Sequence, residues 1–247
     1  YIDGSETRLS LLLSNLSHNN ALDSGGGVYI SSGSTLQATN TLYTDNIARS
    51  TSGGGGGGAI YAEDTAVVAS TNDLYKNNTA TQGSGGGLYV NDNAEWTCSS
   101  CILQNNTAYH HGGALYGKLS ANLSSIQTIY TYNMAANGNG GAVYITSKAL
   151  LSSTRDVFGY NNVAMVGGNG GAFYVEDGGI VHSDTTTFKY HTVSQYGGTI
   201  YMKSGANVTM TNNILFQSSA INGGALYMKN KNTNLIIESS TFRENNA

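Results

Sequence analysis

The chain has 247 residues, no proline, 11 lysines and arginines, and a formal net charge of −4. Only 11% of the residues are charged and the basic ones stand singly, so the sequence offers no basic stripe for a nucleic acid partner. No apolar run approaches the length of about 18 residues that a membrane-spanning helix needs, so we expect no span in this segment.

The whole chain consists of a repeating unit with three short runs of residues that favour strands. The first run contains an apolar residue, which lies seven positions before an aromatic residue or leucine. This apolar residue is present in eight of nine units. The eight are Leu9, Leu36, Val68, Trp96, Leu123, Leu151, Val181 and Leu235. In the remaining unit Thr209 breaks the column, with Val208 beside it. The run predicts a short strand with its apolar residue inside.

The second run of each unit is centred on that aromatic residue or leucine. These residues are Leu16, Tyr43, Tyr75, Leu103, Tyr130, Phe158, Phe188, Phe216 and Phe242. The residue just before them is also apolar in most units, and neighbours in a strand point to opposite faces. One of the two columns is therefore exposed, and we predict that the aromatic residues point inward and that an apolar stripe lies on the surface.

A polar residue follows each aromatic residue three positions later. Seven of the nine are asparagines, namely Asn19, Asn46, Asn78, Asn106, Asn133, Asn161 and Asn245, while His191 and Ser219 fill the other places. Asparagine tolerates the left-handed backbone region, and stacked asparagine amides hydrogen-bond to one another. We therefore expect a structural asparagine column at one corner of the coil.

The third run consists of two glycines, a small residue, an apolar residue and a tyrosine. It occurs eight times, and successive copies are 26 to 32 residues apart. The tyrosines are Tyr29, Tyr61, Tyr89, Tyr116, Tyr144, Tyr174, Tyr201 and Tyr227. Glycine allows a left-handed or closely packed backbone at the corner that precedes the run. Because side chains alternate, the apolar residue points inward, and we predict an exposed tyrosine ladder that serves as a binding surface.

The near-constant period predicts a solenoid in which each unit packs on its neighbours. The apolar runs break after five or six residues, too soon for the spacing of an amphipathic helix. We therefore predict an all-β fold, a right-handed single-stranded parallel β-helix with three short strands per coil and about eight or nine coils. Residues 1–247 form one continuous solenoid in this interpretation. Both ends are abrupt, so we expect a segment of a longer protein.

Two features bear on the cellular compartment. Cys98 and Cys101 are three residues apart without a helix to activate a thiol, so a corner disulfide and two inert thiols are the two alternatives. Asn-x-Ser/Thr sequons, which permit N-glycosylation, occur at Asn15, Asn77, Asn105, Asn122 and Asn207. Neither feature implies a cofactor or a metal ion, and we expect none.

Few residues suggest catalysis. Arg155, Asp156 and Asp184 lie on adjacent coils, and β-helical polysaccharide lyases and hydrolases use such sets as acids, bases or calcium ligands. The glycine run 53–58 lacks the lysine and the helix of a phosphate-binding loop, so we interpret it as a loop insertion. His110 and His111 are expected at the surface of a loop.

The combination of Gly57-Gly58-Ala59-Ile60 with the pattern from Phe158 to Asn161 resembles the paired repeats of chlamydial polymorphic outer membrane proteins and related β-helical surface proteins. The resemblance covers nearly the whole chain and implies an autotransporter passenger that acts in adhesion. We therefore expect a non-enzymatic extracellular or cell-surface protein, an adhesin stalk or a filament subunit. Its partners are expected to be further copies of itself, other surface or matrix proteins, or glycans. A polysaccharide-cleaving enzyme and a sugar-binding module are the alternatives.

Overall fold

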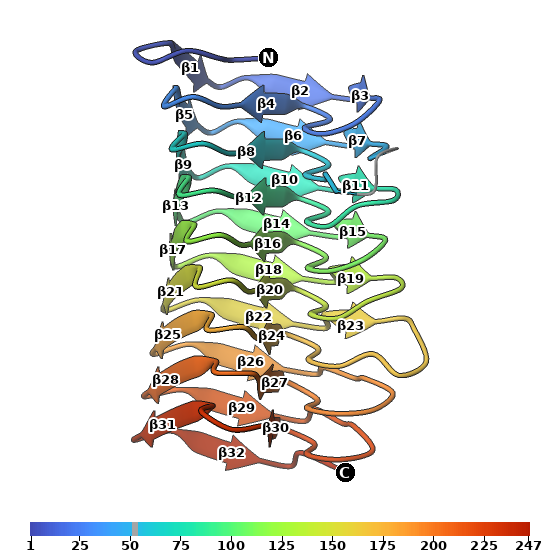
Figure 1. Ribbon diagram of the computed structural model, residues 1–247. Helices are drawn as coiled ribbons and strands as arrows, with labels where there is room; N and C mark the ends of the chain where they lie inside the picture. Colours follow the sequence, from blue (N-terminus) through green and yellow to red (C-terminus); the bar gives the residue numbers. More distant parts are fainter. Residues whose placement is uncertain (51–53) are drawn as a thin grey trace.

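The computed structural model describes residues 1–50 and 54–247, which form a β-solenoid of stacked coils (Figure 1). The paired strands of these residues are parallel and lie in four sheets. Two sheets have nine strands, so the predicted fold class and number of coils are confirmed. Only residues 54–58 of the predicted loop insertion 53–58 lie within the described part of the chain.

Sheets 1 and 2 contain the first two predicted runs of the unit. Sheet 1 consists of β1 (Arg8–Leu12), β5 (Thr35–Thr39), β9 (Val67–Thr71), β13 (Glu95–Ser99), β17 (Asn122–Ile126), β21 (Leu150–Thr154), β25 (Ile180–Asp184), β28 (Asn207–Thr211) and β31 (Asn234–Glu238). Sheet 2 consists of β2 (Asn15–Ser17), β6 (Leu42–Thr44), β10 (Leu74–Lys76), β14 (Ile102–Gln104), β18 (Ile129–Thr131), β22 (Val157–Gly159), β26 (Thr187–Lys189), β29 (Ile214–Phe216) and β32 (Thr241–Arg243).

Sheet 4 contains the tyrosine run, and sheet 3 is an element that the sequence did not predict. Sheet 3 consists of β3 (Asn20–Ala21), β7 (Ile47–Ala48), β11 (Thr79–Ala80), β15 (Thr107–Ala108), β19 (Met134–Ala135) and β23 (Asn162–Val163). Sheet 4 consists of β4 (Val28–Ile30), β8 (Ile60–Ala62), β12 (Leu88–Val90), β16 (Leu115–Gly117), β20 (Val143–Ile145), β24 (Phe173–Val175), β27 (Ile200–Lys203) and β30 (Leu226–Lys229). Most coils thus have four strands rather than three, because the two residues after the column asparagine also pair.

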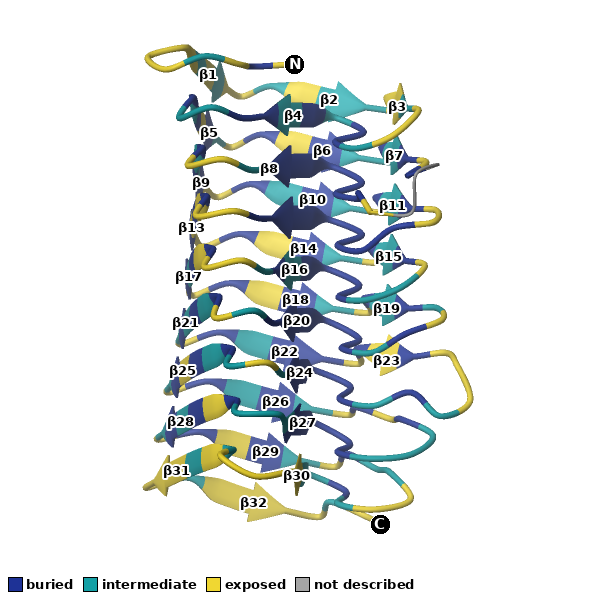
Figure 2. Ribbon diagram, in the orientation of Figure 1, coloured by how far each residue is buried: buried dark blue, intermediate teal, exposed yellow. Residues whose placement is uncertain are grey.

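The core lies inside the coil, and buried residues recur in the strands of successive coils (Figure 2). Tyr43, Tyr75, Tyr130, Phe158 and Phe188 are fully buried, which confirms for these coils that the aromatic residues of sheet 2 point inward. Tyr43 stacks on Tyr75 with ring centroids 4.7 Å apart, and Phe158 lies 5.1 Å from Phe188. Equivalent side chains therefore lie on top of one another along the rod, because parallel strands pair in register.

The asparagine column forms a continuous hydrogen-bonded spine at the corner between sheets 2 and 3. Asn106 Nδ2 donates to Asn133 Oδ1 of the next coil at 3.0 Å, and the backbone N–H of Asn106 donates to the same oxygen at 3.0 Å. A further bond runs from Asn106 Nδ2 to the Tyr75 carbonyl at 2.9 Å. The predicted stacking is confirmed. The predicted left-handed backbone is wrong, because it belongs to the residue before, as in Asn105 with φ 54°.

One coil has a different register from the one expected. Leu215, not Phe216, pairs with Phe188 and is fully buried, so the column partner three residues on is Ser218 rather than Ser219. Ser218 Oγ accepts the His191 backbone N–H at 3.3 Å. A shift of one residue moves every side chain of a strand to the other face. It also restores the apolar column of sheet 1, where Val208 pairs with Val181 in place of the predicted Thr209.

The two glycines before each tyrosine strand have different physical roles. Gly85 has φ +65°, a backbone conformation that favours glycine, and a Cβ there would also lie 2.1 Å from the Leu88 carbonyl oxygen. Gly86 instead lies where three segments of backbone meet, and a Cβ there would be 2.3 Å from the Gly113 carbonyl oxygen and 2.5 Å from Thr107 backbone atoms. Both parts of the predicted reason for glycine at this corner, left-handed backbone and close approach, are therefore confirmed.

Candidate functional surface

The predicted tyrosine ladder exists as a column of stacked rings on the outer face of sheet 4. Ring centroids of successive members from Tyr29 to Tyr227 are between 4.8 and 5.6 Å apart. Tyr1 continues the column at 5.0 Å from Tyr29. The alternation of side chains in sheet 4 thus places the tyrosines outside the coil interior, as predicted.

The prediction that this ladder is exposed is wrong. Tyr61, Tyr89, Tyr144, Tyr174 and Tyr201 are only 2 to 7% exposed, and Tyr29, Tyr116 and Tyr227 are half-buried. The chain that leaves sheet 3 covers the rings before it enters the glycine corner. Tyr89 Oη donates to the Gly54 carbonyl at 3.2 Å, and the His111 ring lies 4.4 Å from the Tyr144 ring. This column is therefore a second packed layer rather than a binding surface.

Carboxylates anchor the phenol groups of the tyrosine column. Glu63 accepts hydrogen bonds from Tyr29 and, at 3.0 Å, from Tyr61. Glu176 accepts from Tyr144 and forms an ion pair with Lys203 at 2.9 Å. Burial, with the neighbouring carboxylate, raises the pKa of each of these tyrosines, so the phenols stay protonated and act as donors.

Two histidines have packing roles, one in a loop and one in the spine. His111, expected at the surface, is half-buried between loop and tyrosine column, and its Nδ1 accepts the Asn139 backbone N–H at 3.1 Å. His191 takes an asparagine's place in the spine, and its Nδ1 accepts the Asn161 backbone N–H at 3.2 Å. Burial lowers the pKa of both histidines to about 4. Both are therefore neutral packing residues at pH 7.

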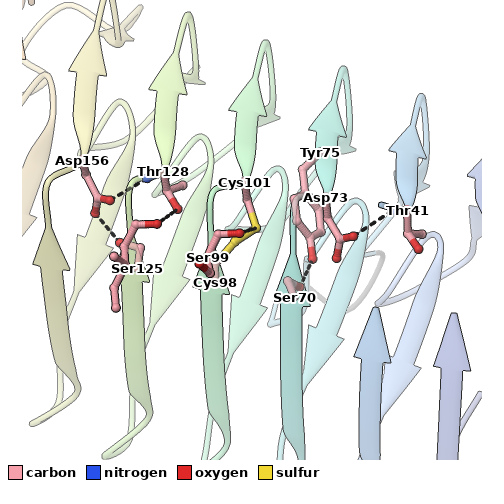
Figure 3. The surroundings of a disulfide bond; sticks show 11 residues. Thr41, Ser70, Asp73, Tyr75, Cys98, Ser99, Cys101, Ser125, Thr128 and Asp156 are labelled. Atoms are coloured by element: carbon pink, nitrogen blue, oxygen red, sulfur yellow. Dashed lines mark hydrogen bonds between the residues drawn. A yellow bond between two sulfur atoms is a disulfide. The ribbon is translucent and has the colours of Figure 1, made fainter. Parts of the chain in front are cut away.

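The structure separates the three residues considered for catalysis. Asp156 is buried at the corner between sheets 1 and 2, where it accepts hydrogen bonds from Ser125 Oγ, from Ser153 Oγ at 2.7 Å and from the Thr128 backbone N–H at 2.7 Å (Figure 3). Arg155 is exposed and has left-handed backbone, and Asp184 is half-buried. Asp156 thus holds the corner of the previous coil from inside, and the three side chains form no common site.

The same corner recurs with different side chains along the rod. Asp73 accepts the Thr41 backbone N–H at 2.8 Å, and Asn213 accepts that of Thr186 at 2.8 Å. In a coil between these two, Cys101 lies at the same corner and forms a disulfide with Cys98 inside the coil (Figure 3). Of the two alternatives predicted for the cysteines, the corner disulfide is therefore the one that the structure has. The bond closes a very short loop, so it staples one corner rather than distant parts of the chain.

The buried Asp156 gives a testable pH dependence. Burial raises the pKa of its carboxyl to about 6, so the folded state binds the proton more tightly than the unfolded chain. The stability that this group contributes is complete below pH about 4 and is lost as the pH rises through about 6. Asn213 provides an uncharged side chain at the same corner of another coil. Replacing Asp156 by Asn is therefore expected to remove this loss, so that between pH 4 and 7 the free energy of unfolding of the variant gains up to about 3 kcal/mol relative to the parent.

Urea unfolding of both proteins at pH 4, 5.5 and 7 measures this difference. His111 and His191 titrate with the opposite sign, since their pKa values are lowered and stability is lost as the pH falls. They are present in both proteins, so their contribution cancels in the difference. A constant difference across the three pH values contradicts the role of Asp156.

An apolar stripe on the outer face of sheet 2 is the exposed feature that the sequence predicted. Leu42, Ile102, Ile129 and Ile214 are 38 to 41% exposed, and Leu74 and Val157 between them are half-buried. We call these six residues the apolar stripe. Thr187 and Thr241 complete the column in the coils toward the C-terminal end. The stripe is straight because its residues from Leu42 to Val157 pair in register, and Thr187 pairs in turn with Val157 and Ile214.

A second aromatic column, which sequence reasoning missed, lies at the corner between sheets 2 and 3. Tyr132, Tyr160 and Tyr190 are 52, 43 and 36% exposed, and their ring centroids are 4.9 and 4.7 Å apart. Each immediately precedes its residue of the spine column. The position directly before each spine residue is the sequence signal that could have identified them, but only three coils have a tyrosine at this position. We call these three residues the corner tyrosines.

The five sequon asparagines are all exposed. Asn77 and Asn105 lie in the column of the corner tyrosines, in the coils before them, and both have left-handed backbone. Asn122 and Asn207 begin β17 and β28 of sheet 1, and Asn15 begins β2 of sheet 2. Residues 1–50 and 54–247 contain no group of three or more His, Cys, Asp or Glu side chains able to hold a metal ion. The same residues contain no helix long and apolar enough to cross a membrane.

Comparison with known proteins gives one match. Residues 100–118 match the family described as the Chlamydia polymorphic membrane protein (Chlamydia_PMP) repeat. No curated protein and no solved structure matches the chain. The matched segment contains Leu103 with its partner Asn106, and then Gly112-Gly113-Ala114-Leu115. It therefore holds both motifs of the resemblance seen in the sequence, and that resemblance is confirmed for this coil. The repeat and the β-solenoid fit a surface or outer-membrane type of protein.

Proposed function

We propose that this chain is a non-enzymatic structural β-solenoid of the cell surface or extracellular space, which acts as a stalk and binds side by side to further copies. The observation that carries this proposal is the apolar stripe, which stays exposed while the tyrosine column is covered. The coils are alike in register and side-chain columns, whereas a catalytic centre requires one coil to differ. The match to a membrane-protein repeat supports the surface location.

The geometry of the stripe favours a second copy as its partner. Successive stripe residues pair in register, so the stripe has the rise of a parallel sheet, about 4.8 Å per coil. Two parallel rods have the same repeat, and the side chains of one stripe can pack between those of the other along the whole length. The net charge of −4 is spread over 247 residues, so repulsion between copies is weak.

The alternatives have less support. Arg155 and Asp156 point to opposite sides of the corner, so a polysaccharide-cleaving site has no assembled residues. A sugar-binding module requires exposed ring faces, but the rings of the tyrosine column cover one another's faces, and the column itself is largely buried. A structural role requires neither an assembled catalytic set nor exposed ring faces.

Replacing Leu42, Ile102, Ile129 and Ile214 by threonine, the residue that positions 187 and 241 already carry in this column, is expected to abolish lateral association. Sedimentation velocity at increasing protein concentration, together with aggregation of beads coated with the protein, measures the effect. The matched control changes Val67, Ile126, Leu150 and Ile180, four outward-facing aliphatic residues of sheet 1, to threonine and is expected to associate like the parent. A parent protein that stays monomeric, or equal loss in both variants, contradicts the proposal.

A further inference from the structure

Two of the five sequons form a natural matched pair. Residues 77–80 and 105–108 have the same sequence, Asn-Asn-Thr-Ala, at the same corner of successive coils. Asn77 and Asn105 are both exposed, with φ 56° and 54°. Strands β11 and β15, which follow them, pair in register. Local sequence and backbone therefore give these two asparagines the same access to a modifying enzyme.

The neighbours of the two asparagines in the next coil differ. Register places Asn105 beside Asn77, and the corner tyrosine Tyr132 beside Asn105. Tyr132 is 52% exposed and stacks on Tyr160 at 4.9 Å with an interplanar angle of 6°. The rings are stacked along the rod, so one face of Tyr132 is covered by Tyr160. The opposite face is turned toward the coil of Asn105, and no other described aromatic ring contacts it.

We propose that Asn105 carries an N-linked glycan whose first sugar packs on the open face of Tyr132. In the modification the Asn105 Nδ2 loses a proton and forms a bond to C1 of the sugar. The bond from C1 to the phosphate oxygen of a lipid-pyrophosphate-linked oligosaccharide breaks, and the lipid pyrophosphate leaves. The apolar face of a pyranose ring then covers aromatic surface that is otherwise in water.

The surroundings of Asn105 suit this modification. Its side-chain amide makes no hydrogen bond to another described residue, whereas Asn77 Nδ2 donates to Asp45 Oδ1 at 3.1 Å. The disulfide between Cys98 and Cys101 lies in the same coil, and disulfides persist in the oxidising compartments where sequons are glycosylated. A glycan on Asn77 would lie beside Asn105 of the next coil, where there is no aromatic ring on which a sugar could pack.

The test uses the chain secreted from a eukaryotic host that glycosylates sequons, with each glycan trimmed to one N-acetylglucosamine. Glycopeptide mass spectrometry is expected to show Asn105 occupied. Thermal unfolding is then measured for the parent, Asn105→Gln, Tyr132→Asn and the double variant. Gln217 and Asn105 already occupy this column, so both replacements suit its left-handed backbone.

With the sugar present, Tyr132→Asn is expected to lower Tm by a few degrees more than it does in the Asn105→Gln background. The loss of contact with Tyr160 is common to both backgrounds and cancels. A parallel cycle with Asn77→Gln is expected to show no coupling to Tyr132, and Tyr132→Phe is expected to keep the full coupling because the ring is retained. An unmodified Asn105, or an equal effect of Tyr132→Asn in both backgrounds, overturns the proposal. These outcomes are independent of whether the rods associate.

Discussion

Replacing Gly86 by alanine is expected to destabilise the solenoid by about 4 kcal/mol or more, or to prevent folding. A Cβ at this position would lie 2.3 Å from the Gly113 carbonyl oxygen and 2.5 Å from backbone atoms of Thr107. Neither neighbour can move by a side-chain rotation, because both belong to backbone that pairs with adjacent coils. Overpacking against immobile backbone is among the few mechanisms with so large an effect.

The control for this prediction is Gly33→Ala, at a different corner of the coil. Gly33 has φ +70°, so alanine is strained there, but the nearest atom to its Cβ is Thr65 Oγ1 at 3.6 Å. The cost is then only that of the left-handed backbone, about 1 kcal/mol. Guanidinium unfolding followed by circular dichroism compares the two. Similar losses for both variants mean that close approach to Gly113 and Thr107 does not explain the second glycine of the motif.

Replacing Asn106 by alanine is expected to cost about 3 to 5 kcal/mol. The side chain donates to the Tyr75 carbonyl and to Asn133 Oδ1, and its own Oδ1 accepts the backbone N–H of Asn78 at 3.1 Å and the Asn78 Nδ2 at 3.0 Å. Alanine removes a partner from the Tyr75 carbonyl and the Asn78 backbone N–H, and one of two hydrogen bonds from both Asn78 Nδ2 and Asn133 Oδ1. The penalty for an unsatisfied buried polar group exceeds the net gain from making a hydrogen bond.

The neighbouring Asn105 provides the comparison for Asn106. Its side chain is exposed outside the spine, and glycine suits its left-handed backbone, so Asn105→Gly is expected to cost well under 1 kcal/mol. Unfolding in urea of protein from a bacterial host, which leaves the sequons bare, separates the two positions. A small loss for Asn106→Ala shows that water can replace the spine contacts, and the column is then dispensable to the fold.

The repeat made the inner columns predictable from sequence. The inward position of Phe158 follows from period and alternation alone, and the asparagine spine follows from its presence in most coils. The register at Leu215 does not, because Phe216 is the more obvious match to the motif. Only the pairing of Leu215 with buried Phe188 decides which residue enters the core.

The exposure of the tyrosine column depended on a part of the coil that has no repeated motif. The segments between sheet 3 and the glycine corner differ in sequence from coil to coil, and period analysis says nothing about the direction in which they fold. They fold back over Tyr89 and Tyr144 because those rings offer apolar surface next to the corner. Burial by such irregular segments is a tertiary property, so the assignment of the outer face as free surface failed.

The spine of asparagines gives the rod a chemical direction. In each step between two asparagines from Asn19 to Asn161, such as Asn78 to Asn106, the amide nitrogen donates to the amide oxygen of the next coil toward the C-terminal end. A break between two such coils consequently leaves a spine amide without its acceptor on the N-terminal fragment and an amide oxygen without its donor on the C-terminal fragment. The two faces are not interchangeable, so severed pieces can rejoin only in their original order and never head to head.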